Sequence, residues 1–134
     1  MIDLDLKGKR AVVTGASLGI GAASVKLLAD HGADVVFCAR NREAVEDLAS
    51  YSSKGGSVTG LVADMGNAES TDEFLVAAEA LGDYDILVNN VGASPSRNFL
   101  YMGDEDWQQL FELNLLSAVR CTRKLLPGMR KKKW

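Results

Sequence analysis

Two hydrophobic patterns alternate along this chain: short runs of consecutive apolar residues, and longer segments in which apolar residues recur every three or four positions. The short runs are typical of buried parallel strands, and the longer segments of amphipathic helices. Strands are predicted at residues 10–14, 34–38, 58–62 and 85–89. Helices are predicted at residues 19–31, from a cap at Asn41 to about Ser50, at residues 70–81, and from a cap at Asp104 toward Met129.

This alternation predicts an α/β fold with one parallel sheet covered by helices on both faces. Right-handed crossovers give the Rossmann-type doubly wound order 3-2-1-4 for the four strands, and the sheet is expected to be truncated before a fifth strand. Ligands of such sheets bind beyond the carboxyl ends of the strands, where the order reverses. We therefore expect a site where residues 14–21 meet residues 89–92.

The glycine-rich segment Thr14–Gly21 follows the first strand directly and opens the first helix. Backbone N–H groups at such a helix start bind a pyrophosphate well, so the segment favours nucleotide binding over a purely structural turn. Gly15 permits the sharp turn, Gly19 the approach of a phosphate, and Gly21 the packing of the helix near the sheet. Ser17 either donates its hydroxyl to a phosphate oxygen or fills a polar turn.

The end of the second strand indicates which dinucleotide is bound. An acidic residue there favours NAD by accepting hydrogen bonds from the ribose hydroxyls, whereas a basic residue favours NADP by neutralising its 2′-phosphate. Residues 38–42 read Cys-Ala-Arg-Asn-Arg, without a carboxylate. Arg40, assisted by Arg42, therefore favours NADP over NAD, and the alternative is an ordinary surface arginine.

Two further polar residues have competing interpretations. Asp64 follows the third strand, where its carboxylate either accepts a hydrogen bond from an adenine amino group or serves a turn or helix cap. Asn114 shares a predicted helical stripe with Trp107, Phe111 and Cys121, so its polar side chain faces the packed side. It is either a functional residue or a core asparagine that bonds to the helix backbone and kinks the helix.

Composition narrows the function classes. The chain has 134 residues, a net charge of -3 and a pI near 5.1, which indicate one soluble domain and argue against nucleic-acid binding. The basic run Arg130–Lys133 is expected to be solvated, with a phosphate-binding patch as the alternative. No apolar stretch is long enough for a membrane span. Cys38 and Cys121 are too few for a disulfide framework and indicate buried thiols in a reducing cytoplasm.

These motifs resemble the N-terminal half of a short-chain dehydrogenase/reductase, similar to its 3-oxoacyl-acyl-carrier-protein reductase-like members. Thr14–Gly21 matches the family's cofactor loop, Asp64–Met65 its adenine-binding pair, and Asn89–Gly92 its Asn-Asn-Ala-Gly segment, with valine in place of alanine. The resemblance covers essentially the whole chain and implies a dinucleotide-binding domain over residues 1–134. The cofactor-binding residues implied are Gly15, Ser17, Leu18, Gly19, Ile20, Gly21, Arg40, Asp64, Met65, Asn90 and Gly92.

The resemblance also implies a catalytic role for Asn114, which matches the asparagine of the family's catalytic tetrad and helps to hold a water in a proton relay. The tetrad's serine, tyrosine and lysine have no counterpart in this chain. Tyr51 and Lys54 are spaced by three rather than four and lie in a loop. We therefore expect the chain to be the cofactor-binding half of a longer enzyme and to be inactive alone.

The expected enzyme is an NADP-dependent oxidoreductase that transfers a hydride between the nicotinamide and a small-molecule carbonyl or secondary alcohol. The alternative is a non-catalytic nucleotide-binding or interaction module. Leu113, Leu116 and Leu126 lie off the apolar stripe of the last predicted helix, residues 104–129. Because this helix packs between subunits in the family, the resemblance implies a homo-oligomer. The acidic charge and the lack of a long apolar stretch predict no nucleic-acid or membrane partner.

Overall fold

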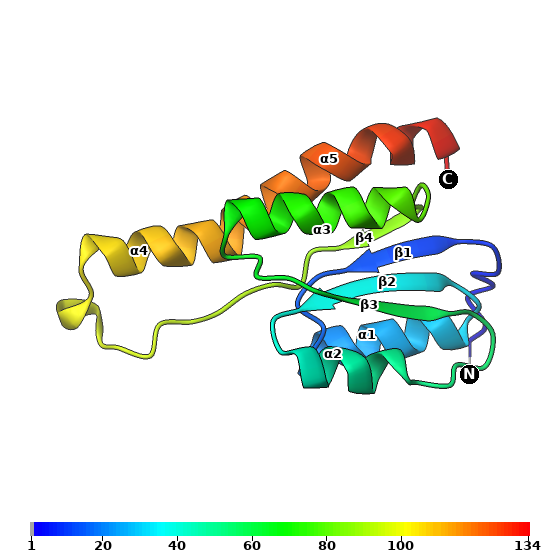
Figure 1. Cartoon of the computed structure of the whole chain (residues 1–134), viewed down its shortest axis with the longest axis horizontal. Helices are drawn as coiled ribbons and strands as arrows, with labels where there is room; N and C mark the ends of the chain where they lie inside the picture. Colours follow the sequence, from blue (N-terminus) through cyan, green and yellow to red (C-terminus); the bar gives the residue numbers. More distant parts are fainter. Residues whose placement is uncertain (1) are drawn as a thin grey trace.

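The computed structural model describes residues 2–134, which form one parallel sheet with helices on both faces (Figure 1). The strands run in the order β3-β2-β1-β4, so the predicted Rossmann-type order 3-2-1-4 is confirmed. Their bounds are Arg10–Val13 for β1, Asp34–Ala39 for β2, Val58–Val62 for β3 and Ile86–Val88 for β4.

The helices form two layers (Figure 1). One face of the sheet is covered by α1 (Gly19–Asp30) and α2 (Arg42–Ala49), and the other by α3 (Ala68–Ala80) and α5 (Ser117–Lys132). A 3₁₀ turn η1 (Phe99–Tyr101), the helix α4 (Asp104–Phe111) and a π-helical segment η2 (Glu112–Leu116) precede α5. The loop after β4, η1 and α4 extend past the carboxyl ends of the strands.

Each face of the sheet has its own apolar core, because alternate residues of a strand point to opposite faces. Val13 and Phe37 pack with α1 and α2, whereas Val12 and Cys38 pack with α3 and α5. Gly60 of β3 makes room for Phe37, since a Cβ there would come within 2.7 Å of the Phe37 ring. No helix between residues 2 and 134 is long and apolar enough to cross a membrane.

Helix starts depend on which side chain satisfies the first free amides. Asn41 caps α2 as predicted, and its Oδ1 accepts a 2.9 Å hydrogen bond from the Ala44 amide. The α3 helix begins earlier than predicted, because Asn67 caps it. The predicted cap at Asp104 was wrong: Gly103 precedes α4, and its amide donates to the Asp106 carboxylate at 3.0 Å.

The last helix differs most from its prediction, because the π-helical segment η2 interrupts it. A π-turn adds a residue to one helical turn, which rotates the part before it relative to the part after it. Cys121 and Leu125 are buried, but Trp107 is 46% and Phe111 60% exposed. The predicted single stripe from Trp107 to Cys121 is therefore wrong.

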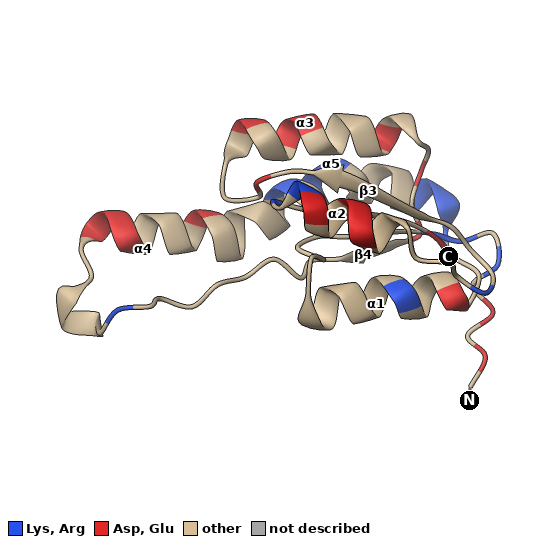
Figure 2. Ribbon diagram, turned by 60° about the horizontal axis from the view of Figure 1, so that its bottom comes forward, with Lys and Arg blue, Asp and Glu red and all other residues tan. Residues whose placement is uncertain are grey.

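The two ends of the long C-terminal helical segment carry opposite charges (Figure 2). The first turn of α4 holds three acidic residues, and the last turn of α5 holds Arg130, Lys131 and Lys132. This basic run was expected to be solvated, but Lys132 Nζ lies 2.8 Å from Oδ2 of Asp85, whose side chain is 2% exposed. Part of the run therefore anchors α5 to the start of β4.

Candidate dinucleotide-binding site

A cleft of about 350 Å³ opens beyond the carboxyl ends of the strands, where their order reverses between β1 and β4. Its walls come from the loop after β1, the ends of β2 and β3, the segment after β4, and η2. Most of the predicted cofactor-binding residues line it, whereas Gly19, Gly21 and Asp64 do not. The lining residues are Gly15, Ser17, Leu18, Ile20, Ala39, Arg40, Ala63, Met65, Asn90, Val91, Gly92, Ala93 and Leu113.

The glycine loop forms the floor of this cleft and needs glycine for different reasons at different positions. Gly15 and Gly19 have φ values of +67° and +58°, a region that side chains disfavour. Gly21 is needed for space, because a Cβ there would lie 2.5 Å from Asn90 Nδ2 and 2.8 Å from the Gly15 oxygen. The Ala16 amide donates a 3.0 Å hydrogen bond to the Cys38 carbonyl, which ties the loop to β2.

The segment after β4 forms the opposite wall and is bonded directly to the glycine loop. Asn90 Nδ2 donates a 2.9 Å hydrogen bond to the Gly15 carbonyl. The amides of Asn90 and Val91 donate to the buried hydroxyl of Thr14, at 3.2 and 3.4 Å. Sequence reasoning missed Thr14 as a site residue, although a hydroxyl at the end of a buried strand was a signal for such a role.

Asn114 does not line the cleft but bonds to the backbone of Ala93, which does. Its Oδ1 accepts a 2.7 Å hydrogen bond from the Ala93 amide, and its Nδ2 donates a 2.8 Å hydrogen bond to the Ala93 carbonyl. It is exposed and bonds to this loop, so the alternative of a core asparagine bonded to its own helix is wrong. Asn114 therefore holds the end of the segment that lines the cleft.

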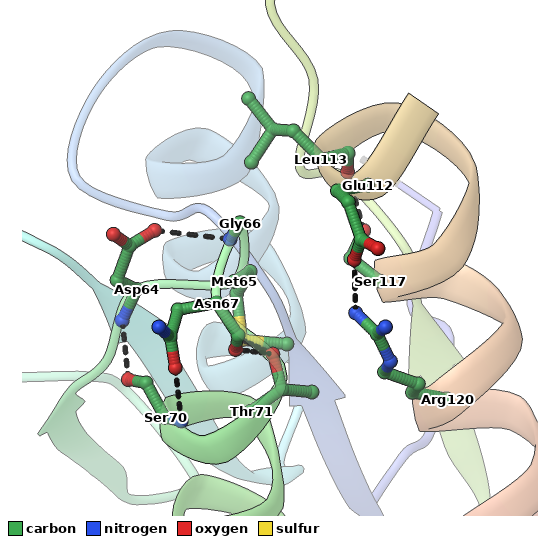
Figure 3. A network of polar contacts seen from close by, with 10 residues as sticks. All are labelled: Asp64, Met65, Gly66, Asn67, Ser70, Thr71, Glu112, Leu113, Ser117 and Arg120. Carbon is green, nitrogen blue, oxygen red and sulfur yellow. Dashed lines mark hydrogen bonds and ion pairs between the residues drawn. The ribbon is translucent and has the colours of Figure 1, made fainter. Parts of the chain in front are cut away.

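The turn after β3, whose polar contacts are drawn in Figure 3, contributes Ala63 and Met65 to the side of the cleft where an adenine was expected. Asp64 Oδ1 accepts a 2.9 Å hydrogen bond from the Gly66 amide, which is the turn role that the sequence left open. Met65 is buried and lines the cleft. Leu113 approaches from η2, 3.5 Å from where a Gly66 Cβ would stand. No local sequence signal identified Leu113, because only the folded helix brings it here.

Arg40 stands at the rim of the cleft, one residue after β2. It is exposed, and within residues 2–134 it forms no ion pair. Its guanidinium is therefore available to an anionic group placed at this end of the cleft.

The two buried thiols and Tyr51 serve structure rather than chemistry. Burial raises the pKa of the Cys38 thiol to about 12 and that of Cys121 to about 11, so neither is an active nucleophile. Tyr51 donates a 2.9 Å hydrogen bond to Asp30, and this bond raises its pKa above the ordinary value. Tyr51 and Lys54 thus tie the loop before β3 to α1.

Comparison with known proteins gives close relatives. Over 128 residues the chain is 39% identical to the uncharacterized oxidoreductase YvrD of Bacillus subtilis strain 168. This alignment covers 96% of this chain and 49% of YvrD. It is 37% identical over 131 residues to the 3-oxoacyl-acyl-carrier-protein reductase FabG of Vibrio cholerae, covering 97% and 53%.

A solved structure is similar along nearly the whole chain. The L-sorbose reductase of Gluconobacter frateurii, in complex with NADPH and L-sorbose, matches 98% of this chain and 51% of its own. The TM-score is 0.88 at 34% identity. This chain spans about half the length of the curated relatives it matches. Residues 9–134 match the model of the short chain dehydrogenase family, and the chain therefore belongs to that family of oxidoreductases.

Proposed function

We propose that the chain binds NADP(H) in this cleft and supplies the cofactor-binding half of an oxidoreductase. The reaction is the transfer of a hydride between the nicotinamide and a small-molecule carbonyl or secondary alcohol. The observation that carries the proposal is the bond between Asn90 and Gly15, which joins the two loops at the reversal point of the sheet. The named reductases among the relatives, one of them solved with NADPH, support it.

The start of α1 suits a pyrophosphate. Leu18, the residue before α1, makes no side-chain cap, and the first turn carries no acidic residue. The first amides of the helix are therefore left for a ligand, and the helix dipole favours an anion there. Nothing lies within 4 Å of the position of a Gly19 Cβ, so the loop offers open space above these amides.

The remaining residues would hold the other parts of the dinucleotide. Arg40 would neutralise the 2′-phosphate of NADP, and Ser17 would donate its hydroxyl to a phosphate. Met65 would pack against the adenine. Asn90 and Gly92 would line the ribose, with Asn114 holding their loop through Ala93. When bound, the nicotinamide supplies or takes up the hydride.

We expect the proton donor for the alcohol or carbonyl oxygen to come from outside the cleft lining that residues 2–134 provide. The residues that line the cleft include no tyrosine, lysine or histidine. Tyr51 is bonded to Asp30, and Tyr84 is buried and donates to the Ala78 carbonyl. General acid–base catalysis needs a group within hydrogen-bond reach of the reacting oxygen. We therefore expect cofactor binding without turnover, which also fits a non-catalytic nucleotide-binding module.

We also propose that two copies associate through the helix formed by α4, η2 and α5. Its outer side exposes Trp107, Phe111, Leu115 and Val119, each more than 40% exposed. The acidic first turn of α4 and the basic end of α5 lie at opposite ends of this apolar surface (Figure 2). An antiparallel pairing about a two-fold axis would set each acidic end opposite a basic one.

Calorimetric titration with NADPH and NADH tests the proposed function. We expect NADPH to bind more tightly, and Arg40→Asp to weaken NADPH by about tenfold or more, the value of a charge-assisted hydrogen bond. Arg123→Asp makes the same charge change on α5, away from the cleft, and should leave the affinity unchanged. A folded chain that binds neither dinucleotide would contradict the proposal.

A further inference from the structure

Asn89 is the residue of the segment after β4 that the proposed function does not use. Unlike Asn90 and Gly92, it does not line the cleft. Its Nδ2 instead donates a 3.2 Å hydrogen bond to the hydroxyl oxygen of Thr122 in α5. The contact joins the first residue after β4 to a helix that contributes nothing to the cleft lining.

The strand β4 depends on side-chain contacts for its placement. It has three residues and stands at the edge of the sheet that residues 2–134 form, paired with β1 alone. Backbone hydrogen bonds therefore hold β4 along one of its two edges only. Beyond the strand, Thr14 holds the amides of Asn90 and Val91 from the β1 side. The bond between Asn89 and Thr122 holds the same stretch from the α5 side.

One continuous helix reaches both ends of this segment. Asn114 bonds to the backbone of Ala93, and Thr122 to the side chain of Asn89. In a regular α-helix, two residues eight positions apart point about 80° away from each other. The additional residue of a π-turn reduces this difference, and Asn114 lies within the π-helical segment η2. The helix thereby holds the two ends of residues 89–93 at once.

We propose that Thr122 is a positioning residue, whose hydrogen bond to Asn89 sets where Asn90–Gly92 stand in the cofactor cleft. The effect on binding rests on the proposed function, because it presupposes that the cleft takes NADP(H). Thr122 acts only through Asn89, since it lines no part of the cleft itself. Both side chains lie where water replaces a lost partner, so removing the hydroxyl loosens the segment without unfolding the chain.

Three variants of the chain test this role. Thr122→Val removes the hydroxyl and keeps the branched shape, and Thr122→Ser keeps the hydroxyl. Thr59→Val makes the first change at an exposed threonine of β3, whose hydroxyl has no partner among residues 2–134. Two quantities are measured in each: amide hydrogen exchange at residues 90, 91 and 93 without cofactor, and NADPH affinity by calorimetry.

We expect Thr122→Val to speed exchange at these amides several-fold and to weaken NADPH by about threefold to tenfold, the range of one hydrogen bond. Thr122→Ser should restore both quantities, and Thr59→Val should change neither. Unchanged exchange, or unchanged NADPH affinity, in Thr122→Val would overturn the positioning role. If exchange rises but the wild-type chain binds no NADPH, the positioning of the segment stands and the proposed function fails.

Discussion

Asn90 Nδ2 lies 2.9 Å from the carbonyl oxygen of Gly15 and donates a hydrogen bond to it. The bond closes the gap between two loops that are 75 residues apart in sequence. Gly21 lies directly against this pair, since a Cβ there would stand 2.5 Å from the same nitrogen. Gly15, Gly21 and the Asn90 side chain thus hold the two loops together beside the cleft in which we propose that the pyrophosphate binds.

Gly21→Ala should therefore harm both the fold and the site. Its Cβ would meet Asn90 Nδ2, and also backbone atoms of Gly15 and Ala16 at 2.8 and 2.9 Å that have little room to shift. We expect a loss of about 1–3 kcal/mol in the free energy of unfolding, as for other overpacked sites, together with weaker NADPH binding. Urea unfolding and calorimetry measure the two effects.

Gly103→Ala is the matched control for that variant. No atom lies within 4 Å of a Gly103 Cβ, and its φ is ordinary at -90°. The change should lower the free energy of unfolding by no more than about 1 kcal/mol, through a weaker helix cap. Equal destabilisation in the two variants would show that crowding at Gly21 is not the cause.

The strands and the glycine loop were predictable because each depends on neighbouring residues, and the right-handed crossover rule then gave the strand order. Consecutive apolar residues identify a doubly covered strand, and glycine spacing identifies the strand–turn–helix junction. The cap at Asn41 was equally local, and the structure confirms it. Local structure of this kind is kept in the folded chain because the tertiary contacts agree with the local preferences.

The phase of the last helix was not predictable in the same way. Nothing in the residue pattern from Trp107 to Cys121 indicates a π-turn. A regular helix would place these two residues on one apolar stripe. In the structure Asn114 bonds to Ala93, and Ser117 Oγ bonds to the Leu113 carbonyl at 2.6 Å within the same turn. Hydrogen bonds of this kind stabilise the π-turn, and Leu113 of the same segment lines the cleft.

Asn114 should stabilise the loop through two separate hydrogen bonds. Asn114→Ala removes both, and we expect the free energy of unfolding to fall by about 1–2 kcal/mol. Asn114→Asp keeps an acceptor for the Ala93 amide but sets a carboxylate oxygen against the Ala93 carbonyl, so we expect at least half of that loss. Urea unfolding measures both, with the exposed Gln108→Ala as the control. Wild-type stability in Asn114→Ala would refute the assignment.

The ion pair between Lys132 and Asp85 should make stability depend on pH. Burial raises the pKa of Asp85, but hydrogen bonds from Lys132 Nζ and the Arg10 amide outweigh it and lower this pKa below its ordinary 3.8. A carboxyl whose pKa is lower in the folded state stabilises the fold above its unfolded pKa. That contribution is lost as the pH falls through the folded value.

Lys132→Met tests this dependence. Without the ammonium, the pKa of Asp85 rises, so acid unfolding should begin at a higher pH than in the wild type. At pH 7 the free energy of unfolding should fall by about 1–2 kcal/mol. Lys131→Met removes an exposed charge that has no ion pair within residues 2–134 and should shift neither quantity. Identical acid-unfolding curves for both variants would contradict the anchoring role of Lys132.

The proposed association predicts a concentration-dependent dimer. Phe111 is 60% exposed, so Phe111→Glu should hardly change the stability of one copy while it places a charge in the apolar surface between two copies. Sedimentation velocity should show a dimer for the wild type and a monomer for the variant. Leu100→Glu changes a residue of η1 that is 82% exposed and lies outside that helix, and should still dimerise. A wild-type chain that stays monomeric at its highest soluble concentration would refute the pairing.

The two thiols should be unreactive until the chain unfolds. Burial raises the pKa of Cys38 to about 12 and that of Cys121 to about 11, so at pH 8 almost no thiolate is present to attack a disulfide reagent. Ellman's reagent should therefore react with neither thiol in the folded chain and with both in urea. Cys38 lies against the glycine loop, where its carbonyl accepts a hydrogen bond from the Ala16 amide, so NADPH should slow the reaction further as it stabilises the fold. Rapid reaction of either thiol in the folded chain would show that its core opens on a faster timescale than this packing allows.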